Sequence, residues 1–141
     1  MVKVLVIDDD IGCPFNVYHK DFLKIYGKIE GFEFVFCDGK TNFDLEVPFE
    51  VQKVIDFVNA NMDADIILLD KTFGVNPQFG IVVLKQLKKL GVNIPVIMFT
   101  SEVSQVVVKE CLAAGVTGFL QKDPWLSAEE FKKSVEEFLY L

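Results

Sequence analysis

Side chains suited to phosphoryl chemistry follow four short apolar runs of the sequence. Three consecutive aspartates at positions 8–10 follow VKVLVI, and Asp70 follows IILL. Thr100 follows IPVIMF, and Lys122 closes the run TGFLQ. If these runs end side by side, at least three carboxylates, a hydroxyl and an ammonium group gather at one place. That combination is suited to binding a metal ion and a phosphoryl group.

Such a gathering of carboxylates needs compensating positive charge. Two carboxylates about 5 Å apart repel each other by roughly 3 kcal/mol at an effective dielectric constant of about 20. Lys122 supplies one positive charge, and a hard divalent ion with oxygen ligands supplies the rest, so we expect Mg²⁺. The only histidine, His19, is predicted on a helix away from this place, which argues against zinc. An aspartate held there can act as a nucleophile and form an acyl phosphate.

The apolar runs have the length and composition of buried strands. They are rich in β-branched and aromatic residues, and three of the five are almost continuously apolar, as strands covered on both faces are. We predict strands over residues 2–7, 32–37, 65–69, 94–99 and 117–121. Between them, apolar residues recur every three or four positions, which predicts helices over residues 17–29, 51–61, 81–90, 103–114 and 127–139.

The fold class follows from this alternation. Five consecutive strand–helix units predict an α/β fold, a doubly wound five-stranded parallel sheet with helices on both faces. Sites in such sheets form at the carboxyl ends of the strands where the strand order reverses, which in the order 2-1-3-4-5 lies between the first and third strands. The acidic residues 8–10 and Asp70 end these two strands. Ser127, followed three residues later by Glu130, predicts the start of the last helix.

Length, charge and cysteine content exclude several classes of protein. We expect residues 1–141 to form a single domain, with no output domain in this chain. A formal net charge of −7 argues against a nucleic-acid-binding surface, and no apolar stretch reaches the roughly 20 residues that a membrane helix needs. Acidic residues follow Met1 too soon for a signal peptide. Three widely spaced cysteines fit a reduced, cytoplasmic protein.

In combination, these motifs resemble the receiver domains of response regulators in two-component signalling, over nearly the whole chain. VLVIDDD is similar to the first strand with its acidic pair, Asp8 and Asp9. IILLD is similar to the strand that ends in the phospho-acceptor, here Asp70. VIMFTS carries the matching hydroxyl residue, Thr100, and AAGVTGFLQKD carries the matching lysine, Lys122. The resemblance implies the flavodoxin-like fold of the chemotaxis regulators.

The resemblance implies a mechanism based on Asp70. This residue would accept a phosphoryl group from a sensor histidine kinase or a histidine phosphotransfer protein, with Mg²⁺ as cofactor. Asp9 would ligate the ion directly, and Asp8 would help largely through water. Asp70 itself and the backbone carbonyl of Thr72 would be further ligands. The chain would be a signalling domain rather than an enzyme, limited to self-phosphorylation from phospho-donors and slow autodephosphorylation.

The resemblance also implies a conformational switch. Lys122 would pair with the phosphoryl group, Thr100 would swing toward it, and Phe119 would follow inward. This movement would reshape the face formed by the fourth helix, the fifth strand and the fifth helix, where a downstream protein would bind.

Three segments depart from the family pattern. The loop after the acceptor, residues 71–80, is longer than the pattern, and the stretch over residues 38–49 is a further extension. Asp123 stands where the family usually has a proline, and it adds a negative charge near Lys122.

Two other functions stay open at this point. Asp8 and Asp10 fit the Asp-x-Asp motif of haloacid-dehalogenase-type phosphatases, with Asp8 as the nucleophile, although such enzymes need a further acidic pair after the lysine. The unusual loops motivate a degenerate receiver, acting as a phosphorylation-independent interaction module. Single residues also have simple structural interpretations: Thr100 as a helix N-cap, Lys122 as a solvated surface residue, and Phe119 as a core residue.

Overall fold

Strands and helices alternate along the chain as the apolar runs predict. The computed structural model describes residues 1–37, 50–122 and 124–140. Its strands are β1 (Val2–Ile7), β2 (Phe32–Phe36), β3 (Ile66–Leu69), β4 (Val96–Thr100) and β5 (Gly118–Gln121). Its helices are α1 (Val17–Tyr26), α2 (Val51–Asn59), α3 (Phe79–Lys89), α4 (Gln105–Ala113) and α5 (Ala128–Leu139). The predicted extension over residues 38–49 and the added charge at Asp123 lie outside the described residues.

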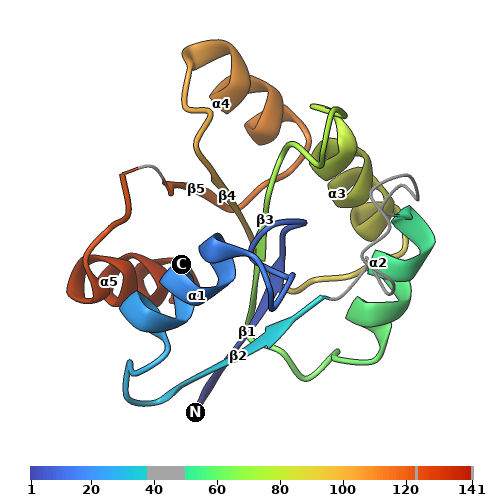
Figure 1. The fold of residues 1–141 in the computed structure, drawn as a ribbon. Coiled ribbons are helices and arrows are strands. Elements are labelled where there is room, and N and C mark those ends of the chain that lie inside the picture. The colour runs from blue at the N-terminus through green and yellow to red at the C-terminus, as the bar shows by residue number, and fades with distance from the viewer. Residues whose placement is uncertain (38–49, 123, 141) are drawn as a thin grey trace.

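All five strands run parallel in one sheet, in the order β2-β1-β3-β4-β5 (Figure 1). The predicted fold class and strand order are therefore confirmed. The order reverses between β1 and β3, because the chain first moves from β1 to one edge and then crosses back to β3. Ile7 lies beside Leu69 in the register of these two strands. The residues that follow them consequently emerge next to each other.

The sheet is covered by helices on both faces, as its apolar strands predict. Successive residues of β1 point to opposite faces, so Leu5 and Ile7 belong to one core and Val4 and Val6 to the other. Helices α2, α3 and α4 close the first core, and α1 and α5 close the second. Figure 1 shows α1 and α5 together on one side of the sheet and α2 and α3 on the other.

Most helix ends differ from the sequence prediction by one to three residues, and two of these differences have a clear structural cause. Helix α1 ends at Tyr26 rather than at Ile29, because the chain then turns through Gly31, at a φ of 83°, to enter β2. Helix α3 begins at Phe79, before the predicted start at Ile81, because Phe79 is itself buried in the core.

The side chains that cap the last two helices are both serines. Thr100 is the last residue of β4, so its interpretation as a helix N-cap is wrong, and Ser104 caps α4 instead. The predicted start of α5 is confirmed, since the Ser127 hydroxyl accepts a hydrogen bond from the Glu130 N–H at 3.2 Å.

None of the helices in the described ranges combines the length and the apolar character that crossing a bilayer requires.

Candidate functional site

The turn after β1 holds Asp8 with both carboxylate oxygens engaged. Its Oδ1 accepts hydrogen bonds from the backbone N–H groups of Asp10 and Ile11, each 2.9 Å long. Its Oδ2 lies 2.6 Å from the Nζ of Lys122. The residue is only 1% exposed, and a charge so deeply buried requires such partners. Asp8 therefore shapes the turn and anchors the lysine.

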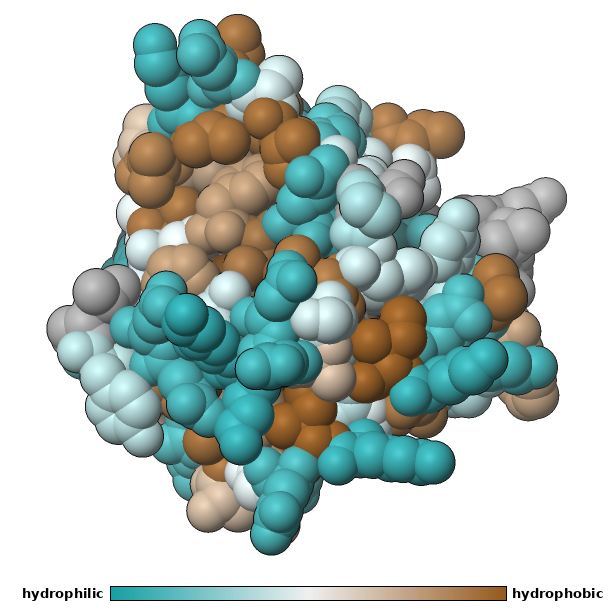
Figure 2. All heavy atoms as spheres, turned by 90° about the vertical axis from the view of Figure 1, so that its left-hand side faces the viewer, coloured by the Kyte–Doolittle hydropathy of each residue, from teal (hydrophilic) through white to brown (hydrophobic). Residues whose placement is uncertain are grey.

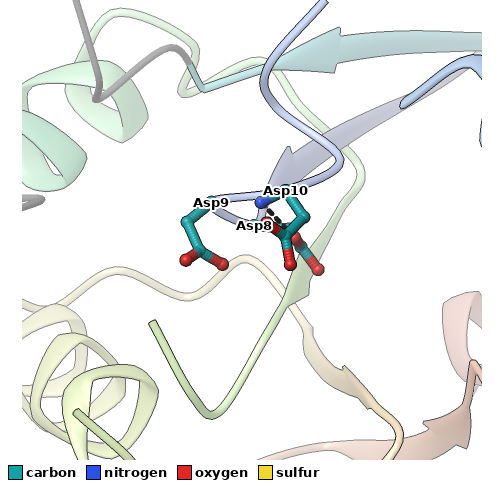
Figure 3. Close-up of side chains that lie close together, drawn as sticks. All are labelled: Asp8, Asp9 and Asp10. Carbon is teal, nitrogen blue, oxygen red and sulfur yellow. Dashed lines mark hydrogen bonds between the residues drawn. The ribbon is translucent and has the colours of Figure 1, made fainter. Parts of the chain in front are cut away.

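Asp9 and Asp10 complete an acidic cluster at this end of β1. Figure 3 shows the side chains of Asp8, Asp9 and Asp10 close together, and one carboxylate oxygen from each lies within 4.8 Å of the others. The Oδ2 of Asp9 also accepts a hydrogen bond of 2.8 Å from the N–H of Gly74, in the loop after β3. The cluster offers the oxygen ligands that a hard cation such as Mg²⁺ prefers.

Asp70, directly after β3, is buried beside this cluster. Its Oδ2 lies 3.1 Å from the Nζ of Lys122. Its Oδ1 is buried without a hydrogen-bond partner, and no other buried side-chain oxygen or nitrogen of the described residues lacks one. Burial and the charge of Asp8 raise the pKa of Asp70 to about 7, against the opposing effects of Lys122 and Thr100. A buried oxygen left without a partner is costly, so it marks a position for a ligand.

Lys122 joins the two acidic strand ends. Its backbone N–H donates to the Thr100 carbonyl at 3.1 Å, so the neighbouring strand fixes where its side chain begins. The side chain is 16% exposed, and its Nζ contacts both Asp8 and Asp70. Burial acts to lower the pKa of Lys122, but the two carboxylates outweigh burial and raise it, so the ammonium stays charged. The interpretation of Lys122 as a solvated surface residue is wrong.

Thr100, the last residue of β4, and Thr72, in the loop after β3, line the same cavity. Thr100 is 1% exposed, and its hydroxyl oxygen accepts a hydrogen bond from the Glu102 N–H at 3.4 Å. Thr72, two residues after Asp70, donates its hydroxyl to the Glu102 carboxylate. This hydrogen bond links the loop after β3 to the loop after β4.

Phe119, the predicted switch residue, lies outside this group. It is half-buried in β5 and packs against the core that α2, α3 and α4 close, and it is absent from the lining of the cavity. The structure therefore brings together five of the predicted site residues with Thr72, but not Phe119. The five are Asp8, Asp9, Asp70, Thr100 and Lys122. In this conformation, Phe119 is part of the core, which agrees with its simple structural interpretation.

The long loop after β3 makes a tight turn that sequence reasoning missed. The backbones of Phe73 and Asn76 pair with each other through two hydrogen bonds of 3.0 and 2.9 Å. Gly74 follows Phe73 at a φ of 57°, which favours glycine, and its N–H binds Asp9. The added length is thus taken up in a turn with an exposed tip at Val75. The glycine within this polar loop was the available sequence signal.

The base of the same loop is held by Lys71 and Gly80. Lys71 is 3% exposed, and its Nζ donates to the carbonyl of Pro77 at 2.6 Å. Gly80 packs so closely that a Cβ there would lie 2.2 Å from the carbonyl oxygen of Asp70. Glycine at a predicted helix start signals such a close approach. The buried lysine had no sequence signal, because lysines are rarely buried.

A cavity of about 520 Å³ lies at this site. Its lining includes Asp9, Asp70, Thr100 and Lys122, together with the half-buried ring of Trp125. Trp125 therefore lines the same cavity as the lysine. Among the described lining residues, the lysine is the only cation, so the lining carries an excess of negative charge. Such a site can hold a divalent cation and an anionic phosphoryl group together.

The sequence matches a known family model over most of its length. Residues 35–136 match the model described as "Response regulator receiver domain". A curated relative, the osmosensing histidine protein kinase SLN1 of Saccharomyces cerevisiae, is 28% identical over 125 residues. The match covers 86% of this chain but only 9% of that kinase.

Solved structures of response regulators share the fold. The chemotaxis protein CheY4 of Vibrio cholerae is 20% identical with a TM-score of 0.70, and 98% of each chain is covered. The receiver domain of the Francisella response regulator 1452 is 25% identical with a TM-score of 0.69, covering 99% of this chain and 98% of that one. A LuxR-family regulator from Aurantimonas sp. SI85-9A1 is 14% identical with a TM-score of 0.72, covering 99% and 86%.

Proposed function

Because this chain belongs to the family of response regulator receiver domains of two-component signalling, we propose that it is a phospho-acceptor switch with Asp70 as the acceptor. The donor would be the phosphohistidine of a sensor histidine kinase or of a histidine phosphotransfer protein. The observation that carries this proposal is the buried Oδ1 of Asp70. It has no hydrogen-bond partner among the described residues, while Lys122 holds the other oxygen.

The groups around Asp70 favour its attack on phosphorus. Lys122 binds Oδ2 and fixes the orientation of the carboxylate, which leaves Oδ1 to form the new P–O bond. The ammonium group and the Thr100 hydroxyl would then stabilise the phosphoryl oxygens. A phosphoryl group adds about −1.5 to −2 charges, and the charged lysine offsets part of them.

The residues present fit Mg²⁺. Asp9, Asp70 and the backbone carbonyl of Thr72 would hold the ion. Both oxygens of Asp8 are already bound within the protein, so Asp8 would act on the ion through water. When bound, Mg²⁺ supplies charge that neutralises the phosphoryl oxygens.

The hydrogen bonds of Asp8 weigh against the phosphatase alternative. A nucleophilic Asp8 would need an oxygen free to attack, but its Oδ1 accepts two backbone hydrogen bonds and its Oδ2 binds Lys122. Membership of the receiver family points the same way. The degenerate module has no specific observation in its favour among the described residues, since the acceptor, the lysine and Thr100 all face one cavity.

We place the output of the switch on the face formed by α4, β5 and α5. Thr100 would move toward the phosphoryl group, and Phe119 would follow it. Figure 2 turns this side of the molecule forward and shows apolar side chains gathered in its upper part, where α4 lies. Val106 is 75% exposed, and Val103 and Leu112 are also exposed. Contiguous apolar surface of this kind is typical of a site for a protein partner.

We also place the domain in the cytoplasm. Its three cysteines form no disulfide bond, and a reducing compartment would keep them reduced. The net charge of −7 weighs against binding to nucleic acid or to an anionic membrane surface.

The proposal is tested by incubating the protein with Mg²⁺ and acetyl phosphate and measuring intact mass. We expect one added phosphoryl group in the wild type and none in Asp70→Asn. The matched control is Asp56→Asn, which alters an exposed aspartate on α2 and should be labelled like the wild type. Labelling that persists in Asp70→Asn would remove Asp70 as the acceptor. Steady turnover of a phosphate ester that depends on Asp8 would favour the phosphatase.

A further inference from the structure

The cavity at Asp70 is larger than a phosphoryl group and a metal ion require. Its volume is about 520 Å³. A phosphoryl group, counted as two water-sized groups, together with an ion and two waters would fill roughly 150 Å³, at about 30 Å³ for each water-sized group. The remaining volume is sufficient for a small ring, and the lining includes two aromatic side chains, Tyr18 and Trp125.

These two side chains come from opposite ends of the sequence and meet beside the acceptor. Tyr18 lies in the first turn of α1, where its backbone N–H binds the Oδ1 of Asn16 at 2.8 Å. Trp125 lies between β5 and α5, three residues after Lys122. Their ring centroids are 6.5 Å apart and their planes are inclined by 43°. We call Tyr18 and Trp125 the aromatic wall.

The core of the protein supports the aromatic wall from behind. The Trp125 ring lies 6.1 Å from the ring of Tyr26 and 6.3 Å from that of Phe99, between centroids. The Tyr26 hydroxyl donates to the carbonyl of Leu126 at 2.8 Å, which fixes the backbone next to Trp125. The Tyr18 side chain is 49% exposed and that of Trp125 is half-buried. The wall is thus positioned on one side and accessible on the other.

We propose that the aromatic wall selects a phosphorylated imidazole ring, the chemistry of a phosphohistidine, and orients it toward Asp70. This inference rests on the proposed phospho-acceptor function and identifies how the donor is recognised. Aromatic side chains bind flat rings through their faces and edges, and they attract a ring that carries a positive charge. The Asp10 and Glu102 carboxylates in the same lining favour a protonated ring as well. A small acyl phosphate has no ring for the wall to bind.

The Asp70 carboxylate and the phosphorylated ring are sufficient for the transfer step, in which atoms and charge are conserved. The Oδ1 of Asp70 attacks phosphorus and forms a P–O bond while the P–N bond of the donor breaks. The electron pair of that bond stays on the ring nitrogen. A donor ring protonated on its other nitrogen leaves as neutral imidazole, so the step needs no additional acid.

The test compares two small donors, since neither brings a partner protein. Rates of Asp70 phosphorylation with Mg²⁺ are measured by intact mass for monophosphoimidazole and for acetyl phosphate. In Tyr18→Leu/Trp125→Leu, we expect the ratio of the two rates to fall about tenfold, the worth of two ring contacts. The single variant Trp125→Phe should keep most of the wild-type ratio, because it retains an aromatic ring at this position. Tyr140→Leu, which removes an aromatic residue that is 83% exposed and absent from the cavity lining, should leave it unchanged.

Two results would overturn the proposal. One is an unchanged rate with each donor in the double variant, and the other is an equal slowing with both donors, which would assign the aromatic wall a structural role only. A wild-type protein that acetyl phosphate does not label would instead contradict the proposed function.

Ring binding is also measured without the reaction, in Asp70→Asn. Trp125 is the only tryptophan of the chain, so its fluorescence reports on the aromatic wall. Monophosphoimidazole should quench it saturably and acetyl phosphate should not, and Tyr18→Leu should weaken the quenching. Equal responses to the two compounds would contradict selection of a ring.

Discussion

The Asp70 carboxylate lies between a like charge, Asp8, and an opposite charge, Lys122, and its side chain is only 7% exposed. Its ordinary pKa of 3.8 is raised to about 7, chiefly by burial and by Asp8. The folded protein therefore binds a proton here more readily than the unfolded chain does. Without a cation, this residue destabilises the fold increasingly as pH rises from about 4 to about 7.

Asp70→Asn removes this penalty and should stabilise the metal-free protein at high pH. In EDTA, we expect the variant to gain stability relative to the wild type between pH 5 and pH 8, by on the order of 2 kcal/mol. Urea unfolding at each pH measures the difference. Asp56→Asn should follow the wild-type pH dependence, since that carboxylate is exposed on α2. Parallel curves for Asp70→Asn and the wild type would contradict the raised pKa.

The residues at the strand ends could be predicted, but several of their partners could not. Parallel strands bring their carboxyl ends together, so the order of Asp8, Asp70 and Lys122 along the sequence was sufficient to place them in one site. The Gly74 N–H that binds Asp9 depends on the course of a loop, which apolar periodicity does not determine. The roles of these residues in phosphoryl transfer stay predictions.

Among the elements, the junction between β3 and α3 leaves no room for an added side chain. Gly80, the second residue of α3, approaches the backbone of the acceptor, and a Cβ there would also lie 2.7 Å from the Cα of Lys71. Its N–H donates to the Lys71 carbonyl at 2.9 Å. The start of the helix is thus joined to the residue after Asp70.

Gly80→Ala should therefore damage both the fold and the site. We expect a loss of about 1–3 kcal/mol in the free energy of unfolding, because neither contacted backbone atom can move without shifting the strand end. Phosphorylation by acetyl phosphate should slow at the same time. Val82→Ala, on the exposed side of α3, is the control and should change stability by less than about 0.5 kcal/mol. If Gly80→Ala keeps the wild-type stability and phosphorylation rate, the junction can rearrange to admit the Cβ, and the prediction is contradicted.

The type and order of the elements followed from the sequence, whereas their ends did not. Period-two and period-three-to-four patterns identify strands and helices, but the last turn of a helix depends on where the chain must go next. Helix α1 stops at Tyr26 although Ile29 continues its apolar spacing, because Gly31 turns the chain into β2. Phe79 joined α3 because a tertiary contact buries it, and no local pattern marks such a contact.

For the molecule as a whole, the site concentrates part of a net charge of −7 in one cavity. Mg²⁺ should therefore raise the stability of the folded protein. At a concentration about 100 times the Kd, the expected gain is about 2.7 kcal/mol. Thermal unfolding with Mg²⁺ and with EDTA measures it. Asp9→Asn should lose most of the gain and Asp56→Asn should keep it, and equal gains in both variants would show that the ion binds elsewhere.

Asp8 and Lys122 form an ion pair although 114 positions separate them in the sequence. Strands β3, β4 and β5 must pair in turn on one side of β1 before these two residues can meet, so the pair closes one of the longest loops in the chain. Contacts at such separation form late in folding, after shorter-range contacts have reduced the entropy lost on closure. A nascent or partly folded chain would hold the acceptor without its lysine. Competence to receive a phosphoryl group would then be among the last properties the protein acquires during folding.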